Sequence, residues 1–245
     1  MKTAIITGSS GAIGIEVLKT FVENGYYVTA QYNKNRASID ALILQLEKEG
    51  IKDRINVVQA DFLDISQVER LYNEHIKVFK TVDVLINNAG VDFYSLAQDV
   101  CCEDYDRVVN INERAPIMLS ALVLKNMIEQ KFGKVLFVSS IWGASGGSFE
   151  SLYSASKSSL IGYTKALAKE VGPSNINVNC ICPGVIESPM NEGYSQEEMQ
   201  DIIDRTPISR IGKPQDVAEL LLFLASERAS FITGQTITID GGFTL

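Results

Sequence analysis

Short apolar runs separated by helix-like segments form the pattern of this chain from one end to the other. Seven runs rich in valine and isoleucine have the length of strands: Thr3–Thr7, Tyr27–Tyr32, Ile55–Gln59, Val82–Asn87, Lys134–Ser139, Asn177–Ile181 and Thr236–Ile239. They do not alternate strictly between apolar and polar residues, which is typical of parallel strands whose two faces are both buried.

Segments with helical periodicity separate these strands: Ala12–Asn24, Ser38–Glu49, Ser66–Phe79, Tyr105–Glu129, Leu152–Val171 and Pro214–Ala225. Repeated strand–helix–strand units predict an α/β fold of the Rossmann type, a doubly wound parallel sheet of about seven strands with helices on both faces. No linker, repeat or low-complexity segment is visible, so we expect a single domain over residues 1–245.

One stretch, residues 187–210, interrupts this rhythm after the sixth predicted strand. It contains a short helical pattern bounded by Gly193 and Pro207. An insertion beyond the carboxyl end of a strand is well placed to cover a ligand crevice, and we expect it to act as a substrate lid. The alternative is a plain connecting excursion.

Charge and composition exclude several classes of function. The chain has 245 residues, of which 46% are hydrophobic, and a formal net charge of −8. This charge argues against nucleic acid or an anionic membrane as the main partner, since both need a basic footprint. There is no signal-peptide pattern and no apolar run of about 18 residues, so we expect a cytoplasmic protein without a membrane segment.

The cysteines and the histidine predict no metal site. The four cysteines are Cys101, Cys102, Cys180 and Cys182, so no Cys-x-x-Cys pair exists. We expect them to be small buried hydrophobic residues in a reducing compartment. His75 is the only histidine, and its helical segment predicts a solvated side chain. Triads and metal sites that depend on histidine are therefore excluded.

A glycine-rich turn follows the first predicted strand directly. Gly8, Gly11 and Gly14 lie between that strand and the body of the first helix. Glycines here allow a tight turn and let main-chain N–H groups approach a pyrophosphate at the helix N-terminus. The position of this turn therefore predicts a dinucleotide site.

The end of the second predicted strand bears on the choice of dinucleotide. An acid at that point would bind a free ribose 2′-hydroxyl and repel a 2′-phosphate. The chain has no acid there, and Asn33 is followed by the cations Lys34 and Arg36. The sequence therefore favours NADP(H) over NAD(H), and the alternative is that both cations are simply solvated.

Candidate chemistry comes from Tyr153 and Lys157, which are four residues apart and so share one face of a helix. A neighbouring ammonium stabilises a phenolate, so we expect Lys157 to lower the pKa of Tyr153 and to make the phenol a proton donor. Ser140 can hold the same substrate oxygen. The three residues predict proton transfer at a carbonyl, although the spacing alone also fits an exposed helical pair.

The order and spacing of these motifs resemble the short-chain dehydrogenase/reductase family over essentially the whole chain. The resemblance rests on the glycine turn, Asp61, Asn87 to Gly90, Asn112, Ser140, Tyr153, Lys157, Pro183 and Gly184. Within the family, the chain is most similar to bacterial 3-oxoacyl-[acyl-carrier-protein] reductases, particularly in RIGKPQDVAELLLFLAS and ITGQTITIDGG.

The resemblance implies a role for each matching residue. The catalytic set would be Asn112, Ser140, Tyr153 and Lys157, with Asn112 holding a water in a proton relay. The residues implied in cofactor binding are Gly8, Ser10, Gly11, Ile13, Asn33, Asp61, Phe62, Asn88, Ala89, Gly90, Tyr153, Lys157, Pro183, Gly184, Ile186 and Ser188. Two positions depart from the family pattern. Ala12 replaces a glycine and demands a helical backbone, and Ser188 replaces a threonine.

Substrate identity is less clearly indicated. A partner as acidic as acyl carrier protein needs cations beside the cleft. The resemblance implies that Lys131 is one such cation and that Ser174 stands where the related reductases carry a second. By contrast, the predicted crevice is bordered by Asp92, Glu150, Glu187 and Trp142, which suit a cationic amino-ketone. Packing of the tryptophan and ordinary solvation of the acids are the alternatives.

The stretch SSIWG also resembles the elongation factor P 5-aminopentanone reductases, whose substrate is a modified lysine side chain. Overall similarity places a carrier-protein ketoreductase first, with an amino-ketone or another small-ketone reductase next. A catalytically idle NADP-binding regulator is a remote third. The resemblance also implies a homotetramer.

Overall fold

The computed structural model describes residues 1–48, 50–191 and 193–245, and for Met190 only the main chain. Seven parallel strands form one sheet: β1 Lys2–Ile6, β2 Tyr26–Tyr32, β3 Ile55–Gln59, β4 Val84–Asn87, β5 Gly133–Val138, β6 Ile176–Pro183 and β7 Thr236–Ile239. Their order is β3-β2-β1-β4-β5-β6-β7, so the direction of winding reverses between β1 and β4. The predicted doubly wound sheet is confirmed, and every predicted strand is present with ends within two residues.

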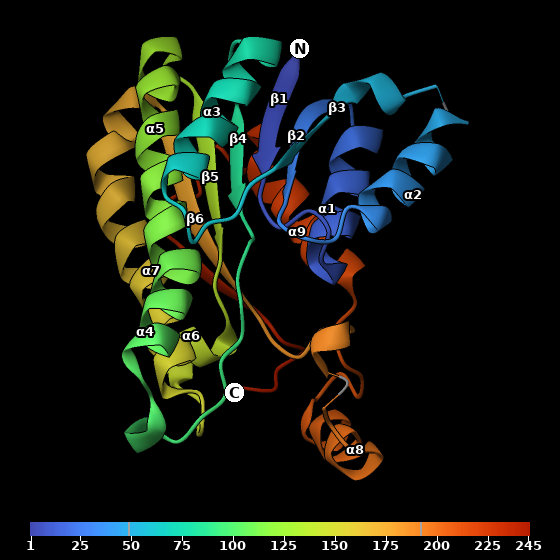
Figure 1. Ribbon diagram of the computed structural model, residues 1–245, viewed down its shortest axis with the longest axis vertical. Helices are drawn as coiled ribbons and strands as arrows, with labels where there is room; N and C mark the ends of the chain where they lie inside the picture. The colour runs from blue at the N-terminus through green and yellow to red at the C-terminus, as the bar shows by residue number, and fades with distance from the viewer. Residues whose placement is uncertain (49, 192) are drawn as a thin grey trace.

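Helices cover both faces of the sheet (Figure 1). The longer ones are α1 Ala12–Glu23, α2 Ala37–Glu47, α3 Ser66–Phe79, α4 Cys102–Val109, α5 Ala115–Gln130, α7 Ser151–Val171, α8 Gln196–Arg205 and α9 Pro214–Ala225, and α6 is the short Ile141–Ser145. One apolar cluster joins the sheet to α1, α2 and α9, and the other joins it to α3, α5 and α7. The central strands are largely apolar because both faces are covered; all six residues of β5 are buried, including Lys134.

One predicted helix is interrupted. The pattern over Tyr105–Glu129 is divided into α4 and α5 by a π-helical turn at Asn110–Arg114. A π-helical turn adds a residue and rotates the side chains that follow it, and such turns often occur at functional sites. The pattern Ser38–Glu49 begins one residue earlier as α2, and Glu49 lies outside the described residues.

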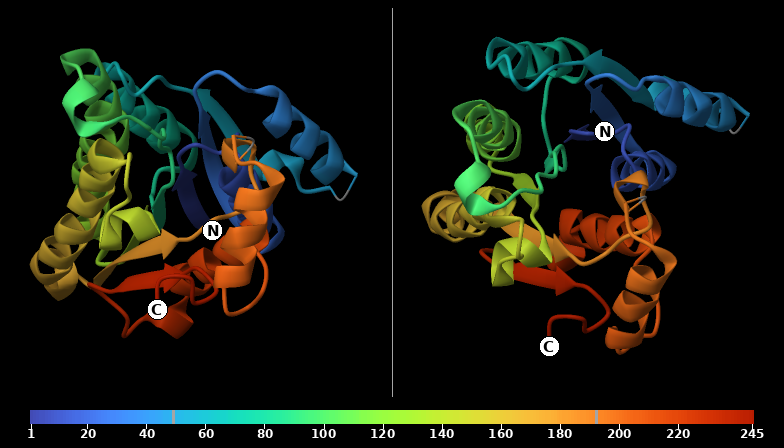
Figure 2. Two further views of the ribbon diagram at one scale, coloured as in Figure 1. Left: turned by 90° about the horizontal axis from the view of Figure 1, so that it is seen from below. Right: turned by 60° about the horizontal axis from the view of Figure 1, so that its bottom comes forward.

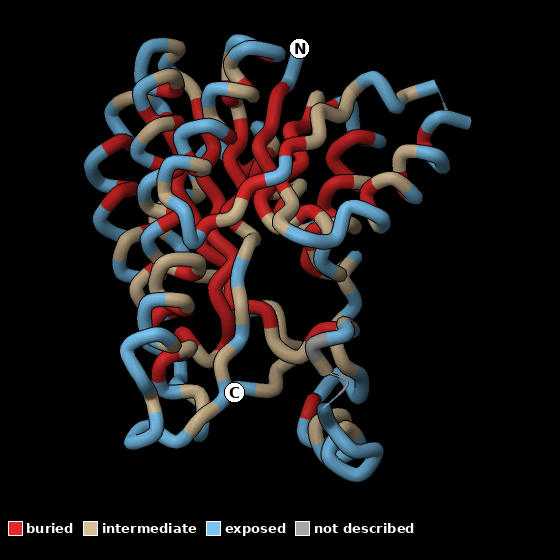
Figure 3. The backbone as a smooth tube through the Cα atoms, viewed as in Figure 1, coloured by how far each residue is buried: buried red, intermediate tan, exposed pale blue. Residues whose placement is uncertain are grey.

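Helix α8 is set apart from the two helical layers (Figure 2). The chain leaves β6 at Pro183 and reaches α8 through a segment in which Ile186 is the one buried side chain among those described, and α8 contains no fully buried residue. Figure 3 shows the contrast with β1, β2, β4, β5 and β6, which are buried along most of their length. A capping box formed by Ser195 and Glu198 starts this helix, so it is locally stabilised without a core of its own.

Two predictions about single side chains are wrong. His75 is fully buried, and its Nδ1 and Nε2 lie 2.8 Å from Thr29 Oγ1 and the Thr81 carbonyl oxygen. Cys180 and Cys182 are buried as predicted, but Cys101 and Cys102 are exposed. The helical pattern around His75 does not distinguish a solvated face from one that packs over β2. In the described part of the chain, no helix is both long and apolar enough to span a membrane.

Candidate active site

The carboxyl ends of the central strands bring the predicted site residues to one edge of the sheet. The glycine turn follows β1, Asn88 to Gly90 follow β4, Ser140 follows β5, and Gly184 follows β6. Adjacent strands in this order pair in parallel, so their ends lie next to one another. This edge, beside the reversal of winding, is where open α/β sheets bind ligands.

The glycine turn is shaped by its main chain. Gly8 has φ +66°, and a Cβ there would lie 2.8 Å from the Cα of Ala89. A Cβ at Gly14 would lie 2.0 Å from the Gly8 carbonyl oxygen. Ala12 is the first residue of α1, so the helical backbone that this departure from the family pattern demands is present. The first turn of α1 carries no acid, which leaves the positive end of the helix open to an anion.

Two polar residues that the sequence patterns did not single out hold this turn in place. Gln31, buried within β2, accepts from the Gly8 N–H at 2.8 Å and donates to the Ala60 carbonyl at 2.7 Å. The Thr7 hydroxyl accepts from the N–H groups of Asn88 and Ala89, each at 3.0 Å. The sequence did contain a signal for Gln31: a glutamine inside a buried strand needs hydrogen-bond partners for its amide, so a structural contact could have been predicted.

Two cationic side chains, Lys34 and Arg36, are predicted near the 2′-phosphate of a bound NADP(H). Only one of them is engaged in an ion pair in the described structure. Arg36 forms an ion pair with Asp40 at 3.1 Å on the exposed surface, whereas Lys34 is exposed without such a partner in the described structure. The Ser38 hydroxyl donates to the Ser10 carbonyl at 3.1 Å and so joins the start of α2 to the glycine turn. Asn33 is partly exposed beside them.

The other predicted nucleotide residues lie after β3, after β4 and in the first turn of α1. Phe62 is 6% exposed and belongs to the apolar cluster that joins the sheet to α3, α5 and α7. The Asp61 carboxylate accepts from the Leu63 N–H at 3.0 Å. The Asn88 amide donates to the carbonyls of Thr7 and Gly8 at 2.9 and 3.2 Å, so it ties β4 to the glycine turn. Ile13 lies partly buried in the first turn of α1.

Beyond β6, the predicted cofactor residues form a narrow strap. Gly184 packs so closely on Asp240 that a Cβ would lie 2.7 Å from the Asp240 Cβ. Ile186 is buried and pairs in parallel with Gly212, and Ser188 is partly exposed. Pro183 ends the strand. The main chain of this strap is thereby held from the sheet to the start of the segment that leads to α8.

Asn112 and Lys157 converge on Gly90. The Asn112 amide receives the Val91 N–H and donates to the Val91 carbonyl, both at 2.8 Å, and also donates to Ser156 Oγ on α7 at 3.1 Å. A Cβ at Gly90 would lie 3.0 Å from Lys157 Nζ and 3.3 Å from Asn112 Oδ1. Asn112 belongs to the π-helical turn, which explains why it faces the site rather than following the regular face of α4.

The predicted net fall in the Tyr153 pKa is wrong for this structure, because burial outweighs the groups that would lower it. Burial raises the pKa of Tyr153 to about 12; the Ser140 side chain acts in the opposite direction, and Glu150 and Asp92 raise the pKa further. Lys157 donates instead to the Val138 carbonyl at 3.0 Å, and its Nζ lies 5.8 Å from the centroid of the Tyr153 ring. Spacing along a helix gives proximity, but it does not report desolvation, which is the larger effect here.

Lys157 is itself strongly affected by its surroundings. It is 4% exposed, and burial lowers the pKa of its amine to about 8. Ser140 is the N-cap of α6, where its Oγ accepts from the Trp142 N–H at 3.2 Å, and it is close enough to Tyr153 to influence the pKa of the phenol. Ser140 and Lys157 are buried and Tyr153 is partly buried, and the three side chains lie together beside the carboxyl end of β5.

Three of the four predicted substrate residues lie near this site. Asp92 and Glu150 both act on the Tyr153 phenol, and the pKa of Glu150 is raised by burial and by Asp92. Gly147 packs between Trp142 and Glu150. Trp142 also contacts Phe243 edge to face, with ring centroids 6.4 Å apart. Glu187 differs because it is exposed and its charge acts on Arg210.

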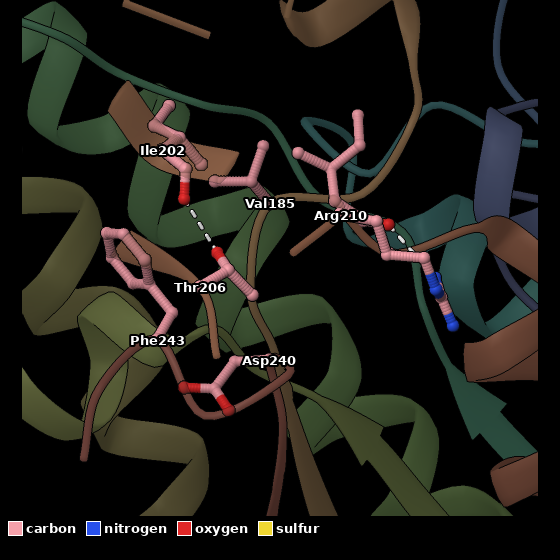
Figure 4. A pocket seen from close by; sticks show the side chains of 8 residues that line it. Val185, Ile202, Thr206, Arg210, Asp240 and Phe243 are labelled. Carbon is pink, nitrogen blue, oxygen red and sulfur yellow. Dashed lines mark hydrogen bonds between the residues drawn. The ribbon is translucent and has the colours of Figure 1, made fainter. Parts of the chain in front are cut away.

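A small pocket lies where α8 returns to the sheet (Figure 4). Val185, Ile202, Thr206, Arg210, Ile211, Gly212, Asp240 and Phe243 line it. The Thr206 hydroxyl points to the Ile202 carbonyl, to which it donates at 2.7 Å. The pocket contains none of Ser140, Tyr153 and Lys157, so we assign it to the base of the 187–210 segment and not to the chemistry.

Comparison with known proteins agrees with this geometry. A family model described as Enoyl-(Acyl carrier protein) reductase matches residues 8–244. The 3-oxoacyl-[acyl-carrier-protein] reductase FabG of Thermotoga maritima is 35% identical over 244 residues, which cover 100% of this chain and 98% of the relative. The uncharacterized oxidoreductase YmfI of Bacillus subtilis is also 35% identical, with 99% and 98% covered.

Among solved structures, a blue fluorescent protein from a metagenomic library, in complex with NADPH, has a TM-score of 0.92 and 30% identity. The alignment covers 100% of this chain and 98% of that chain. A doubly wound sheet with a glycine cradle and a serine, tyrosine and lysine at its edge defines an oxidoreductase of the nicotinamide-dependent class. The chain belongs to the short-chain dehydrogenase/reductase family.

Proposed function

We propose that this protein reduces a ketone to a secondary alcohol with NADPH. The observation that carries the proposal is the convergence of the buried Ser140 and Lys157 with the partly buried Tyr153, with the Lys157 amine against Gly90 after β4. Burial of the Lys157 ammonium costs free energy, because burial disfavours its charge. A purely structural role would not offset that cost.

The residues around this edge suit a nicotinamide dinucleotide. The cradle made by Gly8 and Gly14 leaves no room for side chains, and α1 directs its N-terminus toward the turn. The bound nicotinamide would supply the hydride that reduces the carbonyl carbon. The missing acid after β2 and the exposed Lys34 support NADP(H) over NAD(H). The strap from Pro183 to Ser188 would hold the nicotinamide end.

The titration behaviour of the site suits the reducing direction. With a pKa near 12, Tyr153 keeps its proton at neutral pH and donates it to the developing alkoxide. Ser140 holds the same oxygen. Lys157, with a pKa near 8, is charged below that pH and stabilises the phenolate that Tyr153 leaves behind. Asn112 would connect Lys157 to solvent through a water.

The first substrate class is a 3-oxoacyl group on acyl carrier protein, which similarity to FabG supports. The geometry limits this proposal. Lys131 ends α5 just before β5 begins, so it lies at the amino edge of the sheet, opposite Ser140. Ser174, at the corresponding place before β6, adds no charge. Within one subunit, therefore, neither position predicted to bind the acidic carrier places a cation beside Ser140.

A cationic amino-ketone is the second candidate, because carboxylates face the Tyr153 phenol. Asp92 and Glu150 act on that phenol directly. The two segments that border this side of the molecule, residues 92–106 and 187–204, contain five and six acids respectively and no lysine or arginine. After the second segment, Arg205 pairs with Asp201 and Arg210 with Asp216, whereas Arg107, directly after the first, lies over the Phe93 ring. Such a field attracts a cation and repels an acidic carrier.

The proposed function is tested by following NADPH loss with three ketone substrates that differ in charge. An acetoacetyl thioester on acyl carrier protein, acetoacetyl-N-acetylcysteamine and a 5-amino-2-ketone carry negative, neutral and positive charge. Turnover of the first supports the carrier-protein reductase, and preference for the third supports the amino-ketone reductase. NADPH binding without turnover of any ketone would support an idle cofactor-binding regulator and contradict the proposal.

The wider organisation of the protein enters the proposal as well. We infer a single domain over 1–245 with residues 187–210 as a lid, a cytoplasmic location and a homotetramer. Burial of α8 against the Tyr153 side on substrate binding would support the lid. Analytical ultracentrifugation at micromolar concentration tests the tetramer, and a monomer under those conditions would contradict it.

A further inference from the structure

Ser139 joins the end of β5 to the helix that carries Lys157. It stands between Val138, where β5 ends, and Ser140, and only 4% of it is exposed. Its N–H donates to the Ile181 carbonyl at 2.8 Å, which continues the pairing with β6. Its hydroxyl crosses to α7 and donates to the main-chain carbonyl of Lys157, also at 2.8 Å. One side chain therefore ties the carboxyl end of β5 to one turn of α7.

Lys157 returns to the same strand end through its own side chain. Its amine donates to the Val138 carbonyl at 3.0 Å, one residue before Ser139. The amine also lies beside the segment after β4, because a Cβ at Gly90 would be 3.0 Å from Lys157 Nζ. We call the Ser139–Lys157 and Lys157–Val138 hydrogen bonds the β5–α7 clasp. The first bond holds the main chain of α7, and the second holds the end of a long side chain.

Gly143 leaves the space that the β5–α7 clasp needs. A Cβ at this position in α6 would lie 2.5 Å from Ser139 Oγ and 2.9 Å from both the carbonyl carbon and the Cβ of Lys157. Gly143 does not have a positive φ, so the glycine is needed for space and not for its backbone conformation. The three elements β5, α6 and α7 therefore meet around this hydroxyl–carbonyl contact without room for another carbon atom.

The Lys157 carbonyl does not need the serine for a hydrogen-bond partner. Lys157 lies inside the 21-residue helix α7, and a carbonyl in a helix interior accepts from the N–H four residues later. The alternative to a role in the reaction is that the bond only satisfies the buried Ser139 hydroxyl. In that case its loss would lower stability and leave the Lys157 amine in place.

We propose that Ser139 is a positioning residue whose hydroxyl sets the place of the Lys157 amine between Gly90 and the Val138 carbonyl. This role rests on the proposed reductase function. Ser139 does not hold the substrate oxygen, which is the part of Ser140, and it acts on the reaction only through Lys157. Because four methylene groups separate the lysine amine from its Cα, the place of the amine depends on where the turn of the helix is held. Misplacement by about 1 Å can lower a rate about 100-fold.

Without the Ser139 hydroxyl, we expect the Lys157 amine to leave its buried place. Burial lowers the pKa of Lys157 to about 8, and the titratable groups near its amine are Tyr153 on α7 and the thiols of Cys180 and Cys182 on β6. An amine that gains contact with solvent regains part of its ordinary pKa, which is about 10.4. The titration of the amine should therefore move to higher pH, while kcat/KM for the ketone falls.

The first test compares Ser139→Ala with wild type and with Ser159→Ala. Ser159 is the matched control, because its hydroxyl also donates to a main-chain carbonyl, that of Ser156 at 2.7 Å, but stays within α7. The titration of Lys157 is followed by NMR in ¹³Cε-lysine-labelled protein, with the signal assigned by its absence in Lys157→Met. We expect a higher midpoint in Ser139→Ala and an unchanged midpoint in Ser159→Ala. Equal midpoints in wild type and Ser139→Ala overturn the proposal.

The second test is the pH profile of kcat/KM for ketone reduction. We expect Ser139→Ala to lose about 10- to 100-fold at neutral pH, with an alkaline limb at higher pH than that of wild type. A variant that is less stable but keeps the rate and the alkaline limb of wild type contradicts the proposal. Ser139→Cys retains a weak donor, so we expect smaller changes of the same sign, and it replaces Ser139→Ala if that variant does not fold.

The NMR titration separates this proposal from the proposed function, because it needs no turnover. A raised Lys157 midpoint in Ser139→Ala supports the positioning role even if wild type reduces no ketone, and in that case only the reductase function fails. Ketone reduction by wild type together with an unchanged midpoint in Ser139→Ala supports the reductase and overturns the role of Ser139.

Discussion

Two regions of this sheet edge are stabilised by different physical effects. We call the glycine turn after β1 the nucleotide half, and the region of Ser140, Tyr153 and Lys157 the chemical half. Around the glycine turn, Gly8, Gln31 and Thr7 are held by hydrogen bonds of 2.8 to 3.0 Å and by close main-chain packing, without buried charge. Around β5 and α7, Tyr153 and Lys157 are ionisable groups taken out of water, and burial is the largest influence on both pKa values. Steric fit governs the first half, and desolvation governs the second.

This difference teaches which kind of substitution each half tolerates. A side chain added to the glycine turn meets main-chain atoms that cannot move, so its cost is mainly steric. A charge removed from the chemical half relieves an unfavourable burial, so its cost falls on catalysis rather than on stability. The predictions below test that separation.

The largest expected effect comes from Lys157→Met. Loss of the amine removes the group that stabilises the phenolate, and we expect kcat/KM to fall by about 10²–10³. The free energy of unfolding should stay equal or rise, because a buried charge with one protein acceptor is replaced by an apolar chain of similar length. Steady-state kinetics and urea denaturation measure the two quantities. A variant that loses activity and stability together contradicts the separation.

His75 provides a buried titratable group below the nucleotide half. Its folded-state pKa is lowered from 6.5 to about 4 by burial, so folding favours the neutral ring. The stability that it contributes is present above pH 6.5 and is lost as the pH falls toward 4, by about 3 kcal/mol in total. Urea denaturation of wild type and His75→Gln at pH 7.5 and 4.5 tests this. We expect the wild type to lose more stability between the two pH values, and equal losses would refute the assignment.

Gly14→Ala is expected to act through sterics. The added methyl would lie 2.0 Å from the Gly8 carbonyl oxygen. We expect a loss of about 1–3 kcal/mol in stability and a weaker affinity for NADPH. Gly162→Ala is the matched control, since a Cβ there meets nothing within 4 Å in a helix interior, and we expect equal or higher stability. Thermal unfolding and NADPH fluorescence titration give the comparison, which fails if both variants behave alike.

Glu150→Gln should have the smallest effect. Glu150 raises the pKa of Tyr153, so its neutralisation lowers that pKa and moves loss of the phenolic proton to lower pH. We also expect a few-fold weaker preference for a cationic ketone over a neutral one, and high salt should reduce this difference further. The ratio of kcat/KM for the two ketones at two salt concentrations measures it. A ratio that Glu150→Gln leaves unchanged would remove the argument for the amino-ketone.

The two halves also differ in how far the sequence could predict them. Glycine positions report main-chain geometry directly, so the cradle and the helical Ala12 could be foreseen. The direction of the Tyr153 pKa shift could not, because helix spacing does not show how deeply a phenol is buried. The π-helical turn at Asn112 was also hidden, since an amphipathic pattern continues through it. His75 shows the same limit, as its exposure depends on which face of α3 meets the sheet.

The account's central claim is tested most directly by tracing a hydrogen from coenzyme to product. The ketone that wild type reduces is incubated with NADPH deuterated at C4, and the alcohol is analysed by mass spectrometry for wild type and Tyr153→Phe. We predict one deuterium on the carbinol carbon with wild type, and almost no alcohol with Tyr153→Phe despite retained NADPH binding. The two C4 positions of NADPH are deuterated in separate experiments. The account would be contradicted if wild type gave unlabelled alcohol with both labelled forms, or if Tyr153→Phe turned over at a rate comparable to wild type.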